Sequence, residues 1–284
     1  MLFHSKFFKI KITIMKYILF ISTMILLLSA CTERIDLDLN PSNIKKLVVN
    51  AWLTNETKAH EVYLSLTGDY YKNETPEPAT GATVTISDGD NTYNLTEKAP
   101  GHYFTDDSVH GEAWKSYTLT IQWNGETYTA TSLLRPITPI DSVQVRISDF
   151  QDDSDTLTDY GLFLYALEPP TKDDSYYWKA YLLENPNDLV HTHWEIATDD
   201  FVNGNEIGGA LTLTFPASIG EQYVYEQYSI TDDAFNFLLA VQTETIYKGG
   251  LFDTPPANIP SNVNNGALGY FMTSSVVRDT VLIK

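Results

Sequence analysis

The sequence predicts a mostly β protein, in which an N-terminal immunoglobulin-like or prealbumin-like β-sandwich precedes a β-rich domain with one α-helix. Three observations lead to this prediction. Apolar and polar residues alternate from Leu47 onward, which is the spacing of strands with one buried and one solvent-facing side. Short turn sequences such as Asn124-Gly125 separate the alternating segments. A single segment, near residues 232–248, has helical spacing instead.

The first half of the body contains six candidate strands, which form the predicted sandwich domain. They cover residues 47–54, 61–67, 82–87, 92–97, 117–123 and 126–134. Asp88-Gly89-Asp90-Asn91 closes one hairpin, and Asn124-Gly125 closes another as a two-residue turn that tolerates positive φ. Because no helical stretch lies between these strands, they are typical of a β-sandwich.

A proline-rich segment, Arg135-Pro136-Ile137-Thr138-Pro139, marks the predicted domain boundary. Proline has no backbone N–H to donate, so this segment cannot be a central strand. We therefore place the sandwich domain at residues 47–138 and the second domain at residues 139–284.

The second domain contains six further candidate strands, followed by a last strand pair that starts near Gly269-Tyr270-Phe271. The six strands cover residues 142–148, 161–168, 176–183, 190–198, 211–215 and 223–230.

The helix predicted near residues 232–248 has recognisable ends. Thr231 can cap it, two acidic residues favour its N-terminal end, and Gly249-Gly250 stop it. We expect one face to pack on a sheet. That face contains Phe235, Leu238, Leu239, Gln242 and Ile246.

Residues 1–30 have the three parts of a bacterial lipoprotein signal peptide: a basic start, an apolar middle and small residues at the exit. The apolar run, residues 17–28, is shorter than the roughly 20 residues of a spanning helix. The exit Leu28-Ser29-Ala30-Cys31 matches the lipobox, so we expect cleavage between Ala30 and Cys31 and lipidation of Cys31. Its acyl chains would anchor the protein to a membrane.

Residues 31–46 would then form a tether between the lipid and the body. Two starts of translation stay open, at Met1 or at Met15. Cys31 is the only cysteine, so no disulfide can form within the chain.

The charge of the chain is strongly acidic. The formal net charge is −19, and removing the four lysines of residues 1–30 leaves −23 for the body. This charge repels phosphate backbones, so we expect no nucleic-acid partner. Glu33, close behind Cys31, resembles a surface-export address of Bacteroidota lipoproteins. We expect attachment to the outer membrane, with the cell surface favoured over the periplasmic face.

Several landmarks occur in an order that is typical of one family. They are the lipobox, Leu47-Val48-Val49-Asn50, Gly81-Ala82, Pro139-Ile140-Asp141-Ser142, Asn203-Gly204, Ser229-Ile230-Thr231, Pro255-Pro256, Pro260-Ser261-Asn262 and Gly269-Tyr270-Phe271. In these features the chain resembles the Bacteroidota outer-membrane lipoproteins of domain-of-unknown-function family 4249. The resemblance implies an accessory or ligand-binding partner of a TonB-dependent transporter, which is a β-barrel. It implies no catalytic residues.

His191, His193 and Glu195 are the candidate metal ligands of the sequence, because alternate residues share one face of a strand. Neighbours on that face lie about 6.5 to 7 Å apart, which favours a polar sheet edge with Val190, Trp194 and Ile196 turned inward. An acidic stretch has the oxygen chemistry that Ca²⁺ prefers but lacks an EF-hand pattern. It contains Asp149, Asp152, Asp153, Asp155 and Asp159.

Aromatic runs raise the alternative of carbohydrate stacking, with Tyr176-Tyr177-Trp178 and Tyr223-Val224-Tyr225 as candidates, although packing within sheets also favours such residues. The sequence has no nucleophile motif and no phosphate-binding glycine loop, so we expect no cofactor. The hypothesis is a non-enzymatic, lipid-anchored envelope protein that serves a TonB-dependent transporter. The alternatives are a surface adhesion module and a glycan-acting hydrolase.

Overall fold

The computed structural model describes residues 45–68, 74–149, 151, 157–168, 174–199, 204–246 and 258–284. All of them belong to one compact unit, Ile44–Lys284. The signal peptide, the Ala30–Cys31 cleavage and lipidation site and most of the 31–46 tether lie outside the described residues.

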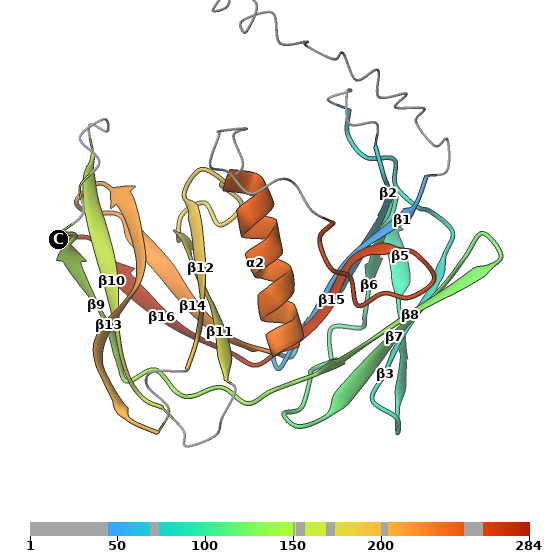
Figure 1. The fold of residues 1–284 in the computed structure, drawn as a ribbon, viewed down its shortest axis with the longest axis horizontal. Coiled ribbons are helices and arrows are strands. Elements are labelled where there is room, and N and C mark those ends of the chain that lie inside the picture. The colour runs from blue at the N-terminus through green and yellow to red at the C-terminus, as the bar shows by residue number, and fades with distance from the viewer. Residues whose placement is uncertain are drawn as a thin grey trace, which may run out of the picture. The chain divides into compact units, whose positions relative to one another are not determined.

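The N-terminal half folds as a β-sandwich, as predicted. One sheet has the order β15-β1-β2-β6-β5 and the other the order β4-β3-β7-β8 (Figure 1). The strands are β1 (Leu47–Thr54), β2 (Glu61–Leu66), β3 (Thr83–Ser87), β4 (Thr92–Asn94), β5 (Thr96–Ala99), β6 (His102–Phe104), β7 (Ser116–Trp123), β8 (Glu126–Leu133) and β15 (Leu268–Ser274).

The alternation of β1 defines the two faces of its sheet. Leu47, Val49, Ala51 and Leu53 are buried in the sandwich core. Asn50 and Trp52, at the intervening positions, lie on the opposite face, because successive side chains of a strand point to opposite sides. This outer face carries the candidate site described below.

The segment predicted as one strand at residues 92–97 is two strands in different sheets. β4 pairs with β3, whereas β5 pairs with β6. Leu95 lies between them, packs against the core and donates its backbone N–H to the carbonyl of Val84 at 2.9 Å. The chain crosses from one sheet to the other at this residue, so the prediction of a single strand was wrong.

The C-terminal half contains two antiparallel sheets, with orders β13-β10-β9 and β12-β11-β14-β16. Leu162, Phe215, Tyr223 and Tyr225 are among the residues buried between them. The strands are β9 (Ser142–Ile147), β10 (Thr158–Leu167), β11 (Ser175–Leu182), β12 (Thr192–Thr198), β13 (Glu206–Ala217), β14 (Gln222–Ile230) and β16 (Val276–Leu282). The mostly β fold class with one described helix is confirmed.

β15 crosses from the C-terminal half into the first sheet. It runs parallel to β1 over seven residue pairs, from Val48↔Leu268 to Thr54↔Ser274, and Figure 1 shows the two strands side by side. The predicted terminal strand pair was wrong, since β16 pairs with β14 instead. The boundary predicted between residues 138 and 139 stays a prediction about domains, but sheet membership crosses it.

Buried hydroxyl groups fix this crossing. The hydroxyls of Ser229 and Ser275 both donate to the backbone carbonyl of Arg135, at 2.7 Å each. The backbone N–H of Thr273 donates to the Ser132 hydroxyl at 3.2 Å. Strands from both halves therefore share one set of hydrogen bonds where the chain passes between them.

Helix α2 (Asp232–Ile246) starts where it was predicted. The backbone N–H of Ala234 donates to the hydroxyl of Thr231 at 3.3 Å, which is an N-terminal cap. The predicted end at Gly249-Gly250 lies outside the described residues. Among the described residues, no helix is long and apolar enough to cross a membrane.

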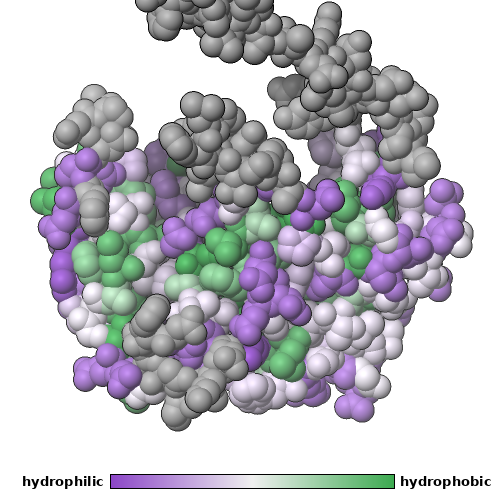
Figure 2. All heavy atoms as spheres, viewed as in Figure 1, coloured by the Kyte–Doolittle hydropathy of each residue, from purple (hydrophilic) through white to green (hydrophobic). Residues whose placement is uncertain are grey.

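The packing face of α2 differs in part from the prediction. Phe235, Phe237 and Leu238 pack against buried side chains, and Phe237 stacks on Tyr270 with ring centroids 4.7 Å apart. Leu239 is 43% exposed, so its predicted burial was wrong. The helix contacts β11, β12 and also β15, which the sequence did not place beside it. Figure 2 shows hydrophobic and hydrophilic side chains together over α2.

We expect Gly269→Ala to destabilise the protein more than Gly125→Ala. Both glycines have positive φ, 92° and 80°, so each substitution carries the same backbone strain, roughly 1–2 kcal/mol. Only at Gly269 would the added Cβ collide with backbone, lying 1.9 Å from the carbonyl oxygen of Val49. Urea denaturation of both variants measures the difference. Equal losses of unfolding free energy would show that β15 does not require this close approach.

Candidate ligand-binding site

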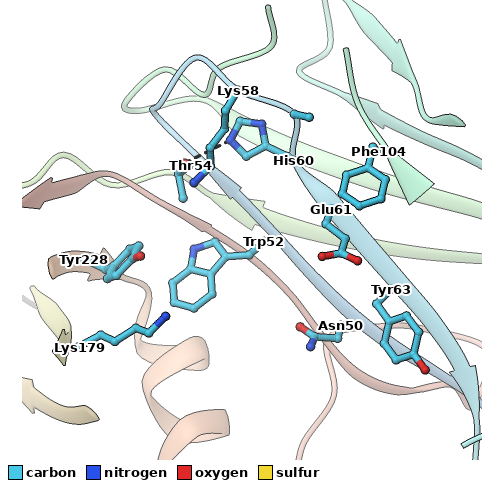
Figure 3. Close-up of a pocket in the computed structure, with 11 residues that line it drawn as sticks. Asn50, Trp52, Thr54, Lys58, His60, Glu61, Tyr63, Phe104, Lys179 and Tyr228 are labelled. Atoms are coloured by element: carbon cyan, nitrogen blue, oxygen red, sulfur yellow. Dashed lines mark hydrogen bonds between the residues drawn. The ribbon is translucent and has the colours of Figure 1, made fainter. Parts of the chain in front are cut away.

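The outer face of the β1–β2 sheet and the neighbouring strands β11 and β14 enclose a hollow of about 500 Å³ (Figure 3). Its walls combine aromatic rings, two lysines, one carboxylate and uncharged polar groups. The lining residues are Asn50, Trp52, Thr54, Lys58, Ala59, His60, Glu61, Tyr63, Phe104, Lys179 and Tyr228. A concave surface that mixes aromatic and polar side chains is typical of small-molecule sites.

Trp52 is the central aromatic residue of the hollow. Its indole N–H donates to the hydroxyl of Ser274 on β15 at 3.0 Å. Its ring centroid lies 4.8 Å from that of Tyr228 and 5.4 Å from that of Tyr177. The hydrogen bond and the two ring contacts fix the indole in one orientation, so it does not have to be ordered when a ligand binds.

A second aromatic group lies on β2 and β6. The ring of Tyr63 lies 4.4 Å from the ring of His102, and the imidazole of His102 is hydrogen-bonded to the carboxylate of Glu61. Phe104, on the same strand as His102, also lines the hollow. Alternate positions of neighbouring strands thus present rings toward the same space.

Glu226 organises the charged groups on the β14 side of the hollow. It is only 3% exposed and accepts hydrogen bonds from the Tyr228 hydroxyl at 2.6 Å and from Arg278 Nε at 2.6 Å. The Tyr181 hydroxyl also donates to it at 3.2 Å, and burial together with Glu226 raises the pKa of Tyr181 to about 12. A buried carboxylate is tolerated here because its oxygens are paired with a cation and hydroxyls.

Arg278 connects this carboxylate to the loop between β1 and β2. Its Nη2 donates to Glu56 Oε2 at 2.9 Å, and the same oxygen accepts from Lys58 Nζ at 2.7 Å. Burial lowers the pKa of Lys58, and the nearby Glu226 opposes that effect. Two cations and two carboxylates therefore form a connected network at one end of the hollow.

Lys179 lies outside this network. It extends from β11 toward the hollow and Trp52 in Figure 3. Its Nζ lies 4.9 Å from the centroid of the Tyr181 ring. No carboxylate of the described residues lies within ion-pair distance of this ammonium group.

His60 is buried beside the hollow and is 2% exposed. Its Nε2 lies 3.2 Å from the Thr54 hydroxyl, and its backbone N–H donates to the Thr105 hydroxyl at 2.8 Å. Burial, followed by the positive charge of Lys58, lowers the pKa of His60 to about 4. His60 is therefore neutral at pH 7, and its imidazole contributes no positive charge to the hollow.

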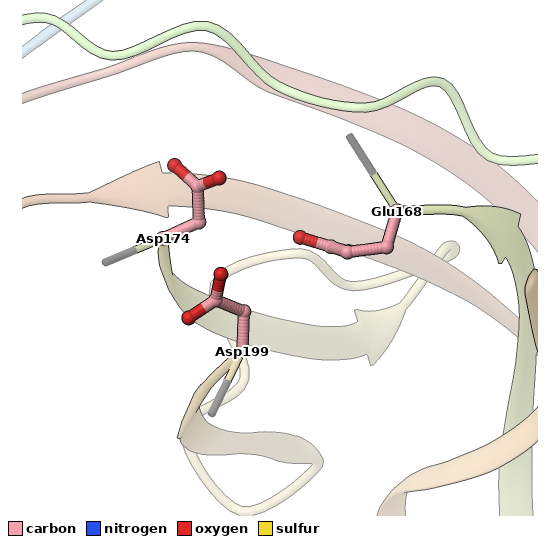
Figure 4. Close-up of side chains that lie close together, drawn as sticks. All are labelled: Glu168, Asp174 and Asp199. Carbon is pink, nitrogen blue, oxygen red and sulfur yellow. The ribbon is translucent and has the colours of Figure 1, made fainter. Parts of the chain in front are cut away.

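A separate acidic group brings together Glu168, Asp174 and Asp199, which follow β10, precede β11 and follow β12 (Figure 4). One carboxylate oxygen from each lies within 4.8 Å of the others. Arg135 pairs with Asp174, and the Tyr176 hydroxyl donates to Glu168. Burial, and then the two aspartates, raise the pKa of Glu168. These oxygens suit a hard cation, although Arg135 already balances part of their charge.

The three candidate metal ligands predicted from the sequence, one at each of positions 191, 193 and 195, contact different partners. His191 Nδ1 lies 2.7 Å from Asp188 Oδ2, and the ring of His193 stacks on Phe215 at 4.4 Å. Glu195 accepts a hydrogen bond from Gln242 on α2 at 3.0 Å. The group of metal-ligating atoms found among the described residues is the Glu168 group and contains none of these side chains.

β12 lies at the edge of its sheet, as the sequence predicted, but only part of its predicted apolar face is turned inward. Ile196 is buried and Trp194 packs on Tyr177 at 5.8 Å, but Val190 is 78% exposed because β12 begins only at Thr192. Of the acidic stretch, Asp159 lies in β10 and is buried, whereas the segment with Asp152, Asp153 and Asp155 lies outside the described residues.

The aromatic candidates divide between core and site. Tyr223 and Tyr225 are each 0% exposed and belong to the core, so they offer no ligand platform. Tyr177 contacts Trp52 at the edge of the hollow. Sequence reasoning missed Trp52 and Tyr63. Their signal was available, because both are large aromatic residues at the solvent-facing positions of alternating strands.

We expect the stability of the protein to fall as the pH is lowered from about 6.5 to about 4, partly through His60. The folded pKa is depressed, so the unfolded chain takes up a proton that the folded chain refuses in this range. Each unit between the two pKa values corresponds to about 1.4 kcal/mol. His60→Gln cannot take up this proton and should flatten the dependence in urea denaturation at several pH values. His110→Gln, at an exposed position, is the control, and unchanged slopes in both variants would contradict the assignment.

Comparison with known proteins identifies the family of this chain. No curated protein matches the chain. Among solved structures, a two fibronectin type-III domain segment from chicken tenascin is similar at 8% identity and a TM-score of 0.23, covering 84% of this chain and 99% of that one. Residues 32–280 match the family described as Domain of unknown function (DUF4249). The chain belongs to this family.

Proposed function

We propose that this protein is a lipid-anchored, non-enzymatic binding protein of the outer membrane, which holds a small ligand in the hollow beside Trp52 and serves a TonB-dependent transporter. The observation that carries the binding role is the preformed hollow of about 500 Å³ with its fixed aromatic rings. Attachment through Cys31 rests on the lipobox Leu28-Ser29-Ala30-Cys31. The transporter partner rests on the resemblance to envelope lipoproteins.

The charged groups around the hollow favour binding over catalysis. Glu226 is held by Arg278, and Glu61 is held by His102. A general acid or base has to exchange its proton with the substrate, whereas Glu226 is already engaged by the Arg278 guanidinium and Glu61 by the imidazole of His102. The acidic body, with its charge of about −23, favours a soluble domain that does not adhere to anionic headgroups.

We expect Cys31→Ser to abolish lipid attachment. The serine hydroxyl cannot take the diacylglyceryl group, so the variant should carry no lipid and should stay as the longer precursor. Incorporation of labelled palmitate and the apparent mass of the chain measure both effects. Thr32→Ser, one residue further along, is the control and should be labelled like the natural chain. Labelling of the Cys31→Ser variant would refute lipidation at this position.

We expect the full-length protein to retain a large β-barrel transporter in near-equal amount when it is captured from detergent-solubilised outer membranes. The tag belongs at the C-terminus, because Lys284 is exposed. Capture of the Cys31→Ser variant from the same cells is the control for contacts formed after lysis. Recovery of the protein alone from cells that display it on their surface would contradict the transporter role and favour adhesion. Turnover of a glycan, lost on substitution of one carboxylate, would favour a hydrolase.

A further inference from the structure

Two features of the hollow specify a ligand more closely than its size does. The first is a lysine that lines the hollow and forms no ion pair. Lys58 and Arg278 have Glu56 and Glu226 as partners, but the ammonium group of Lys179 has no ion-pair partner among the described residues. A half-buried cation without a counterion favours a ligand that brings a negative charge.

The second feature is the arrangement of rings and hydrogen-bonding groups around this charge. The Trp52 indole is fixed by Ser274, and Tyr63 and Phe104 line the same space. The amide of Asn50 and the carboxylate of Glu61 lie between these rings in Figure 3. Fixed rings can stack on the apolar face of a sugar, while an amide and a carboxylate can bond its hydroxyl groups.

The charge of the whole body limits the size of such an anion. A body of about −23 repels a polyanion along its whole length, whereas a small ligand with one carboxylate meets mainly the local field of Lys179. A volume of about 500 Å³ lies within the range of roughly 300–1,000 Å³ typical of sites for small ligands.

We infer that the hollow binds an acidic sugar, with its carboxylate at Lys179 and its ring against Trp52. This inference rests on the proposed binding function and names the class of ligand for the same site. The carboxylate would form a charge-assisted hydrogen bond to Lys179 Nζ. The sugar hydroxyls would bond to Asn50 and Glu61.

The test is a titration of the full-length protein in detergent with D-glucuronate, D-glucose and benzoate, followed by calorimetry and by tryptophan fluorescence. We expect D-glucuronate to bind at least tenfold more tightly than D-glucose, which has the ring without the carboxylate. Benzoate has the carboxylate without the sugar hydroxyls and should also bind at least tenfold more weakly. Equal binding of glucose, tighter binding of benzoate or no binding of glucuronate would each overturn the inference.

Substitutions locate the binding. Lys179→Met nearly keeps the length of the side chain and removes its charge. It should therefore lower the affinity for D-glucuronate at least tenfold and leave the affinity for D-glucose unchanged. Lys46→Met removes the charge of an exposed lysine that does not line the hollow, and it should change neither of these affinities. Asn50→Ala, at an exposed position that is not part of the core, should weaken the binding of both sugars. An unchanged affinity for D-glucuronate in the Lys179→Met variant would show that the carboxylate does not bind at Lys179.

The outcome can be separated from that of the proposed function. If a transporter co-purifies but D-glucuronate does not bind, the accessory role stands and the ligand class is wrong. If D-glucuronate binds in a manner that depends on Lys179 but no barrel co-purifies, the ligand class stands and the transporter role is wrong.

Discussion

The parallel pairing of β15 with β1 is the interaction on which the rest of the structure depends. It inserts a strand from the end of the chain beside the first strand of the body, over seven residue pairs. Gly269 allows the close backbone approach at Val49, and Ser274 at the other end of β15 holds the indole of Trp52. One pairing therefore completes the first sheet and fixes the central ring of the hollow.

The second constraint is the burial of charge beside that ring. Glu226 is nearly inaccessible, and leaving such a carboxylate without a partner would cost several kcal/mol. Arg278 on β16 meets this need and also reaches Glu56 in the loop after β1. Because the ion pairs join strands from both halves of the chain, they hold the wall formed by β1 and β2 against the wall formed by β11 and β14.

Local patterns in the sequence were enough to predict where most strands lie but not which strands pair with one another. Alternation located β1 at residues 47–54 without error, because its buried and exposed positions follow the period of two. The same pattern continued through Leu95, where the chain changes sheets, because this crossing residue still packs against the core and so leaves the alternation intact. The pairing of β15 and the assembly of Trp52, Tyr63 and Lys179 around one space depend on contacts between distant segments, which no local pattern contains.

The way the carboxylates are partnered explains why binding suits this site. Glu61 is hydrogen-bonded to the imidazole of His102, Glu226 is paired with Arg278 and Glu56 is paired with Lys58, so each of these acidic groups already has a partner within the fold. Lys179 differs from them, because its ammonium group lies near the ring of Tyr181 and forms no ion pair with any residue that the structure describes. An anion that enters can meet this ammonium group without breaking an existing ion pair. The fold thus keeps the energetic cost of accepting a negative ligand low while the fixed rings limit what shape that ligand can have.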